Sequence, residues 1–71
     1  MMTLINTIDG VKQDLLQEGR RISRLKQQTA YCLIHGETFG RVVTNVDVAQ
    51  ALVRDGYRLY AKFNEYGDLV L

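Results

Sequence analysis

Apolar residues in the first third of the chain recur with the spacing of an amphipathic helix. Successive members are four, three, four, seven and three residues apart, which places them on one stripe: Leu4, Ile8, Val11, Leu15, Ile22 and Leu25. Acidic residues lie near the start of this segment and basic residues near its end, as the helix dipole favours. The pattern predicts a helix over about residues 7–28. Glu18 interrupts the stripe beside Gly19, so a kink or two shorter helices there is a second interpretation.

The middle of the chain changes to compact apolar and β-branched runs. Residues 31–35 are followed by a turn-like insert between Gly36 and Gly40, and then by residues 41–43. We predict that the two runs pair as a β-hairpin. An alternative extends the first helix through Ile34 and ends it at Gly36, a common position for glycine. Apolar periodicity alone does not separate these interpretations.

The last third of the chain predicts a second helix and a second hairpin. Thr44 with Asp47 three residues later is a helix-start signal, and Gly56 ends the helix predicted over residues 45–55. Residues 57–63 alternate, with one face formed by Tyr57, Leu59, Ala61 and Phe63 and the other by Arg58, Tyr60 and Lys62. A turn containing Gly67 lets residues 69–71 pair back onto this strand.

The element order α-β-β-α-β-β predicts a single small α+β domain over residues 1–71. We expect both helices on one face of an antiparallel sheet. Of the 71 residues 46% are hydrophobic, so a core is available. Cys32 has no second cysteine to pair with, and His35 is the only histidine, so a four-ligand zinc site does not fit within one chain. We therefore expect no metal or other cofactor, and stability from core packing or from a second subunit.

Charge and hydropathy indicate the cellular compartment and the kinds of partner to expect. The net charge of +1 does not demand a nucleic-acid partner. The start of the chain lacks a basic signal-peptide region, and no apolar run approaches the roughly 18 residues of a membrane span. We expect a cytoplasmic protein with neither a membrane nor a small-molecule substrate as partner.

Candidates for catalysis are few. Cys32 and His35 form the one nucleophile and base pair, and on a strand residues three apart point to opposite faces. The acidic residues are scattered, and no glycine-rich loop has the lysine and following helix of a phosphate site. We expect a protein that is not an enzyme.

Two basic features indicate binding surfaces for a protein or a nucleic acid. The first lies within two turns of the predicted helix and comprises Arg20, Arg21, Arg24 and Lys26. The second is the polar strand face formed by Arg58, Tyr60 and Lys62, where an aromatic ring between cations is typical of base-stacking surfaces. Both also have structural interpretations, as a solvated helix end and as an ordinary surface strand.

The apolar stripe from Leu4 to Leu25 predicts more buried surface than one short sheet requires. We expect it to form the interface of a homodimer. Together these features predict a small regulatory or adaptor protein that binds another macromolecule, with a partner protein at the basic cluster. The alternative is a nucleic-acid-binding regulator that uses the same cluster. Compact regulators of mobile genetic elements are often of this size and likewise lack catalytic or metal-binding motifs.

Overall fold

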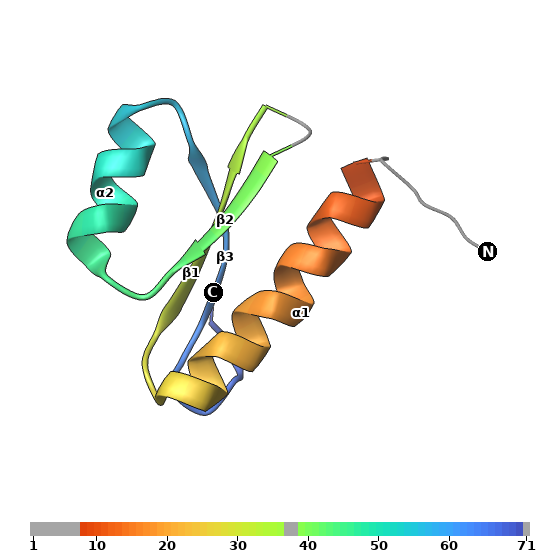
Figure 1. Cartoon of the computed structure of the whole chain (residues 1–71), viewed down its shortest axis with the longest axis vertical. Helices are drawn as coiled ribbons and strands as arrows, with labels where there is room; N and C mark the ends of the chain where they lie inside the picture. Colours follow the sequence, from red (N-terminus) through yellow and green to blue (C-terminus); the bar gives the residue numbers. More distant parts are fainter. Residues whose placement is uncertain (1–7, 37–38, 71) are drawn as a thin grey trace.

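A computed structural model describes residues 8–36 and 39–70, with side chains from residue 12 onward in these ranges. It confirms the predicted element order and the α+β class (Figure 1). The six elements are α1 (Ile8–Lys26), β1 (Ala30–His35), β2 (Phe39–Val43), α2 (Val46–Arg54), β3 (Arg58–Phe63) and β4 (Leu69–Val70).

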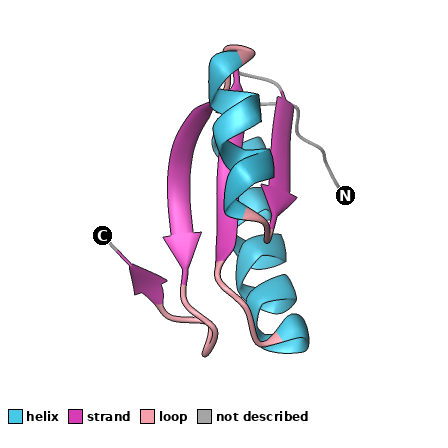
Figure 2. Ribbon diagram, turned by 90° about the vertical axis from the view of Figure 1, so that its left-hand side faces the viewer, coloured by secondary structure: helices cyan, strands magenta, loops and turns pink. Residues whose placement is uncertain are grey.

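The four strands form one antiparallel sheet in the order β2-β1-β3-β4 (Figure 2). The first hairpin is confirmed, because β1 pairs with β2 from Tyr31 opposite Val43 to His35 opposite Phe39. The alternative of a longer first helix is therefore wrong. The short β4 pairs only with the end of β3, where Phe63 lies opposite Leu69.

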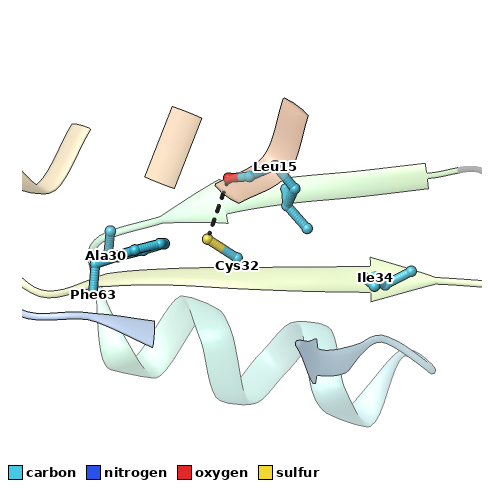
Figure 3. Close-up of a cluster of buried hydrophobic side chains, with 5 residues drawn as sticks. All are labelled: Leu15, Ala30, Cys32, Ile34 and Phe63. Atoms are coloured by element: carbon cyan, nitrogen blue, oxygen red, sulfur yellow. Dashed lines mark hydrogen bonds between the residues drawn. The ribbon is translucent and has the colours of Figure 1, made fainter. Parts of the chain in front are cut away.

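The two helices cover opposite faces of the sheet, so the prediction that they share one face is wrong. Cys32 and Ile34 of β1 pack with Leu15 of α1, whereas the intervening Leu33 packs with Leu52 of α2. Figure 3 shows α1 and α2 on the two sides of β1. A strand that is buried on both sides has apolar residues at successive positions instead of alternate ones. This explains the unbroken apolar run in β1.

α1 is one continuous helix that approaches the sheet closely at Gly19. Gly19 is buried, and a Cβ at this position would collide with the sulfur of Cys32 and press on the ring of Phe63. One turn later Ser23 is also fully buried, and its hydroxyl donates to the carbonyl oxygen of Arg20 at 2.9 Å. Beside the break in the apolar stripe, small residues thus contact the sheet, and the alternative of two shorter helices is wrong.

The helix ends differ slightly from the sequence signals. α1 ends at Lys26, after which Gln27 adopts a positive φ of 54° and the N–H of Gln28 donates to the carbonyl of Ser23 at 3.2 Å. α2 is capped by Asn45 and not by Thr44, because the Asn45 Oδ1 accepts from the backbone N–H of the second and third helical residues at 2.7 and 3.2 Å.

A β-bulge interrupts the alternation of β3. Ala61 lies opposite Cys32, but the next pair joins Leu59 to Leu33, which leaves Tyr60 as an extra residue. Ala61 therefore faces α1, whereas Leu59 lies on the α2 side. The expectation that alternate residues of this strand share one apolar face is wrong, because the sequence pattern contains no sign of the bulge.

Candidate functional site

Two arginines on the second half of α1 reach the turn that joins β3 to β4. Figure 1 shows the C-terminal end of α1 beside this turn. The Nε of Arg20 donates to the carbonyl oxygen of Gly67 at 3.1 Å, and the Nε of Arg24 donates to that of Tyr66 at 3.2 Å. The two arginines are one helical turn apart, so they lie side by side on the flank of α1 next to β3. These contacts set the direction of both guanidinium groups.

Hydrogen bonds within the turn hold those carbonyls in place. The Oδ1 of Asn64 accepts from the N–H groups of Tyr66 and Asp68 at 2.9 and 3.0 Å, which closes the turn internally. Gly67 has a φ of 87°, and the side chain of Arg24 occupies the place that a Cβ of Gly67 would take. Glycine is therefore required both by the backbone conformation and by the arginine that packs against it.

The arginine pair, which we define as Arg20 and Arg24, retains terminal donors that no described residue uses. Each Nε is used by the turn, and among the described residues no protein acceptor binds a terminal Nη of either side chain. The guanidinium of Arg20 also lies over the ring of Phe63, with its carbon 5.2 Å from the ring centroid. A shallow hollow of about 520 Å³ lies here, lined by Gln17, Arg20, Arg21, Arg24 and Leu25.

The other two members of the predicted basic cluster differ from this pair. Arg21 donates from Nε and Nη2 to the carboxylate of Glu18 at 3.2 and 2.8 Å. This hydrogen bonding, helped by the charge of Glu18, raises the pKa of Arg21. Lys26 is exposed in the last turn. Of the four cations, two therefore form an oriented pair, one arginine is paired with a carboxylate, and the lysine is exposed.

The second predicted basic surface is divided between two faces of the sheet. Arg58 lies opposite Ile34, whose side chain packs toward α1, but Lys62 lies opposite Tyr31, which packs on the α2 side. The prediction that Arg58, Tyr60 and Lys62 share one face is therefore wrong for Lys62. Tyr60 joins Arg58 on the α1 side, where the Nζ of Lys12 lies 5.4 Å from the centroid of the Tyr60 ring.

Sequence reasoning missed Lys12 as part of this surface. A pocket of about 140 Å³ is lined by Lys12, Ile34, Arg58, Leu59 and Tyr60. The sequence contained one sign of this arrangement. Lys12 lies eight residues before Arg20, and this spacing places both residues on the same flank of the helix. The sequence predicted the strand itself but did not show that it runs along this flank of the helix.

The predicted dimer stripe does not form one outward surface. Leu15 is only 6% exposed and packs in the core of its own chain, so in this structure it offers little surface to a second subunit. Ile22 is half-buried, and Leu25 is 69% exposed. Leu4 lies outside the described residues, as do the side chains of Ile8 and Val11. The homodimer stays a prediction.

Cys32 and His35 are not brought together. The Cys32 thiol is buried and donates to the carbonyl oxygen of Leu15 at 3.5 Å (Figure 3). His35 is exposed, and its ring meets that of Tyr57 edge-on at 4.9 Å between centroids. Within the described part of the chain, no three His, Cys, Asp or Glu side chains gather as a metal site. None of the described helices is both long and apolar enough to cross a membrane.

Burial of Cys32 predicts a loss of stability in alkali. Desolvation raises the pKa of the thiol from its ordinary value of 9.0 to about 11. Between these values the unfolded chain loses the thiol proton and the folded chain keeps it, so stability falls as the pH rises. We expect a slope of up to about 1.4 kcal/mol per pH unit. Urea denaturation at pH 8 to 11 measures it, and an equal slope in Cys32→Ala would contradict this origin.

Comparison of the chain with known protein families, with characterised proteins and with solved structures finds no match in any of the three. We therefore infer the function from the chemistry of the arginine pair and of the surface around it.

Proposed function

We propose that this protein acts without catalysis, by binding an acidic segment of a partner protein at the arginine pair. The observation that carries the proposal is the orientation of Arg20 and Arg24 by carbonyls of the β3–β4 turn. A guanidinium presents planar donors that match a carboxylate, and hydrogen bonds between charged groups are stronger than neutral ones. The outward Nη groups supply those donors.

Orientation before binding favours affinity. A flexible arginine loses rotamer entropy when a ligand fixes it, at a cost of about 0.5–1.5 kcal/mol for each side chain. The turn has already restricted Arg20 and Arg24, so a carboxylate that binds them meets a smaller entropic penalty. An ordinary solvated helix end lacks this arrangement.

The surroundings favour a protein partner over a nucleic acid. Leu25 and Tyr66 border the arginines and are 69% and 70% exposed. Arginine and tyrosine are enriched among the residues that dominate protein interfaces, and an apolar neighbour adds buried area. Nucleic-acid affinity depends on many phosphate contacts, whereas Arg21 is already paired with Glu18.

The test uses a fluorescently labelled hexaglutamate peptide, with hexaglutamine as its uncharged counterpart, in an anisotropy titration. We expect the protein to bind hexaglutamate and not hexaglutamine. Each lost charge-assisted hydrogen bond is worth about 1.5–3 kcal/mol, so Arg20→Gln with Arg24→Gln should weaken binding by more than tenfold. The control pair Arg41→Gln and Arg54→Gln removes the same charge elsewhere and should change the affinity less than twofold.

Two measurements complete this test. Arg24→Lys keeps the charge and removes the Nε contact, so intermediate affinity is expected if orientation matters. Circular dichroism of each variant establishes that the fold is retained. Equal effects of the site and control pairs would refute the arginine pair. Tighter binding of single-stranded or duplex oligonucleotides than of hexaglutamate at about 200 mM salt would assign the surface to nucleic acid instead.

A further inference from the structure

The cations on the β3 flank of α1 form a row that is longer than the arginine pair. Three contacts fix their order along the sheet: Lys12 with Tyr60, Arg20 with Phe63, and Arg24 with the carbonyl of Tyr66. α1 and β3 therefore run in the same direction. Each successive cation of the helix lies beside a later residue of the strand or of the turn that follows it. Arg58 joins the row at the Lys12 end.

A small cavity lies at the Lys12 end of the row, separate from the hollow beside the arginine pair. The buried Ile34 contributes to its apolar wall, Lys12 and Arg58 supply two positive charges, and Tyr60 also lines it. Among the described side chains, no acidic residue lines this cavity, and the only ion pair joins Arg21 to Glu18. A volume of about 140 Å³ suits one carboxylate group with its first carbons.

The opposite flank of α1 has the opposite charge. Asp14 and Glu18 line a groove of about 270 Å³ together with Gly40 and Val42 of β2. α1 therefore carries carboxylates on the side of β2, of which Glu18 is paired with Arg21, and cations on the side of β3. An acidic chain is repelled from the first flank and attracted to the second, so it binds on the β3 side of α1.

We propose that the partner segment lies extended along this basic flank, with one acidic side chain at the arginine pair and another in the Lys12–Arg58 cavity. This inference rests on the proposed function and specifies the ligand of the same surface. Lys12 and Arg24 are twelve residues apart on the helix, or about 18 Å. An extended chain advances about 3.3 Å per residue, so the two acidic groups lie roughly five or six residues apart.

The bulge in β3 indicates how such a segment is held. At Tyr60 the regular backbone spacing of the strand is interrupted, so a peptide does not add to it as a further strand. Side chains therefore hold the segment, and its acidic groups determine affinity more than its backbone does.

The experiment compares two labelled peptides of equal composition. One carries two glutamate pairs separated by four threonines, and the other carries four adjacent glutamates followed by the threonines. We expect the spaced peptide to bind at least tenfold more tightly. Lys12→Gln with Arg58→Gln should remove this advantage and leave the adjacent peptide unaffected. The control is Lys62→Gln with Arg41→Gln, which removes equal charge outside this flank and should preserve the preference.

Each outcome has a separate meaning. Equal affinity of the two peptides, or a preference that survives loss of Lys12 and Arg58, overturns the extended docking and leaves the arginine pair intact. Binding that is also insensitive to Arg20→Gln and Arg24→Gln overturns the proposed function itself. If an oligothymidine binds more tightly than the spaced peptide at about 200 mM salt and loses affinity in the same variants, the flank is a nucleic-acid surface and the peptide assignment fails.

Discussion

Replacing Phe63 by alanine is expected to remove a large part of the stability of this protein. Phe63 is 1% exposed and lies in the cluster between α1 and the sheet, next to Gly19 and beneath the guanidinium of Arg20. Truncating a buried phenylalanine destabilises a protein by about 3–5 kcal/mol. A chain of 71 residues has a total stability of roughly 4–10 kcal/mol. Urea denaturation followed by circular dichroism measures the loss.

A matched control separates core packing from aromatic content. Tyr66 is 70% exposed, and its carbonyl, which holds Arg24, is retained in any variant. Tyr66→Ala should therefore change the free energy of unfolding by less than about 0.5 kcal/mol. A Phe63→Ala protein that unfolds at the same urea concentration as Tyr66→Ala would show that the α1 cluster is not the main core.

The second large effect is expected for Gly19→Ala, although alanine favours helices by about 1 kcal/mol over glycine. The new methyl group would collide with the sulfur of Cys32 and approach the ring of Phe63 to about 3.0 Å. Inserting a methyl group into a packed core typically costs about 1–3 kcal/mol. After subtraction of the helix preference, we expect a net destabilisation of up to about 2 kcal/mol, measured by urea denaturation, because the contact at Gly19 joins the helix directly to the sheet.

Double substitution tests the cause of that effect. Cys32→Ala alone leaves a small cavity and should be destabilising, whereas in the Gly19→Ala background it removes the atom with which the methyl group collides. The two changes should therefore be less harmful together than the sum of their separate effects, by about 1–2 kcal/mol. Additive effects would contradict the close contact. Gln17→Gly on the exposed face of α1 measures the helix preference alone.

The element order was predictable because local signals determined it. The apolar spacing of α1, the polar residues before α2 and the glycines in the turns act within a few residues of one another. The arrangement of the helices was not predictable in the same way. An unbroken apolar run in residues 30–34 fits a strand covered on both faces, but it equally fits a buried helix, and only the sheet separates the two.

The candidate site was predictable only in part. The sequence located Arg20 and Arg24, because four residues separate them on a helix, and it located Arg58 and Tyr60 on one side of a strand. It gave no indication that the carbonyls of a distant turn hold the arginines. It also separated Lys12 from the site, since the pairing of α1 with β3 depends on long-range packing that no local pattern records.

The bulge at Tyr60 also has a consequence for aggregation. Among the described residues, β4 covers only the last two positions of β3, so the outer backbone groups of its first half face no strand. An uncovered strand edge is a template for pairing between molecules and for fibril growth. The extra residue breaks the regular register that a neighbouring molecule would need, and Arg58 and Lys62 place positive charges on opposite sides of this strand. Two such edges therefore repel each other, which disfavours pairing between molecules along the uncovered half of β3.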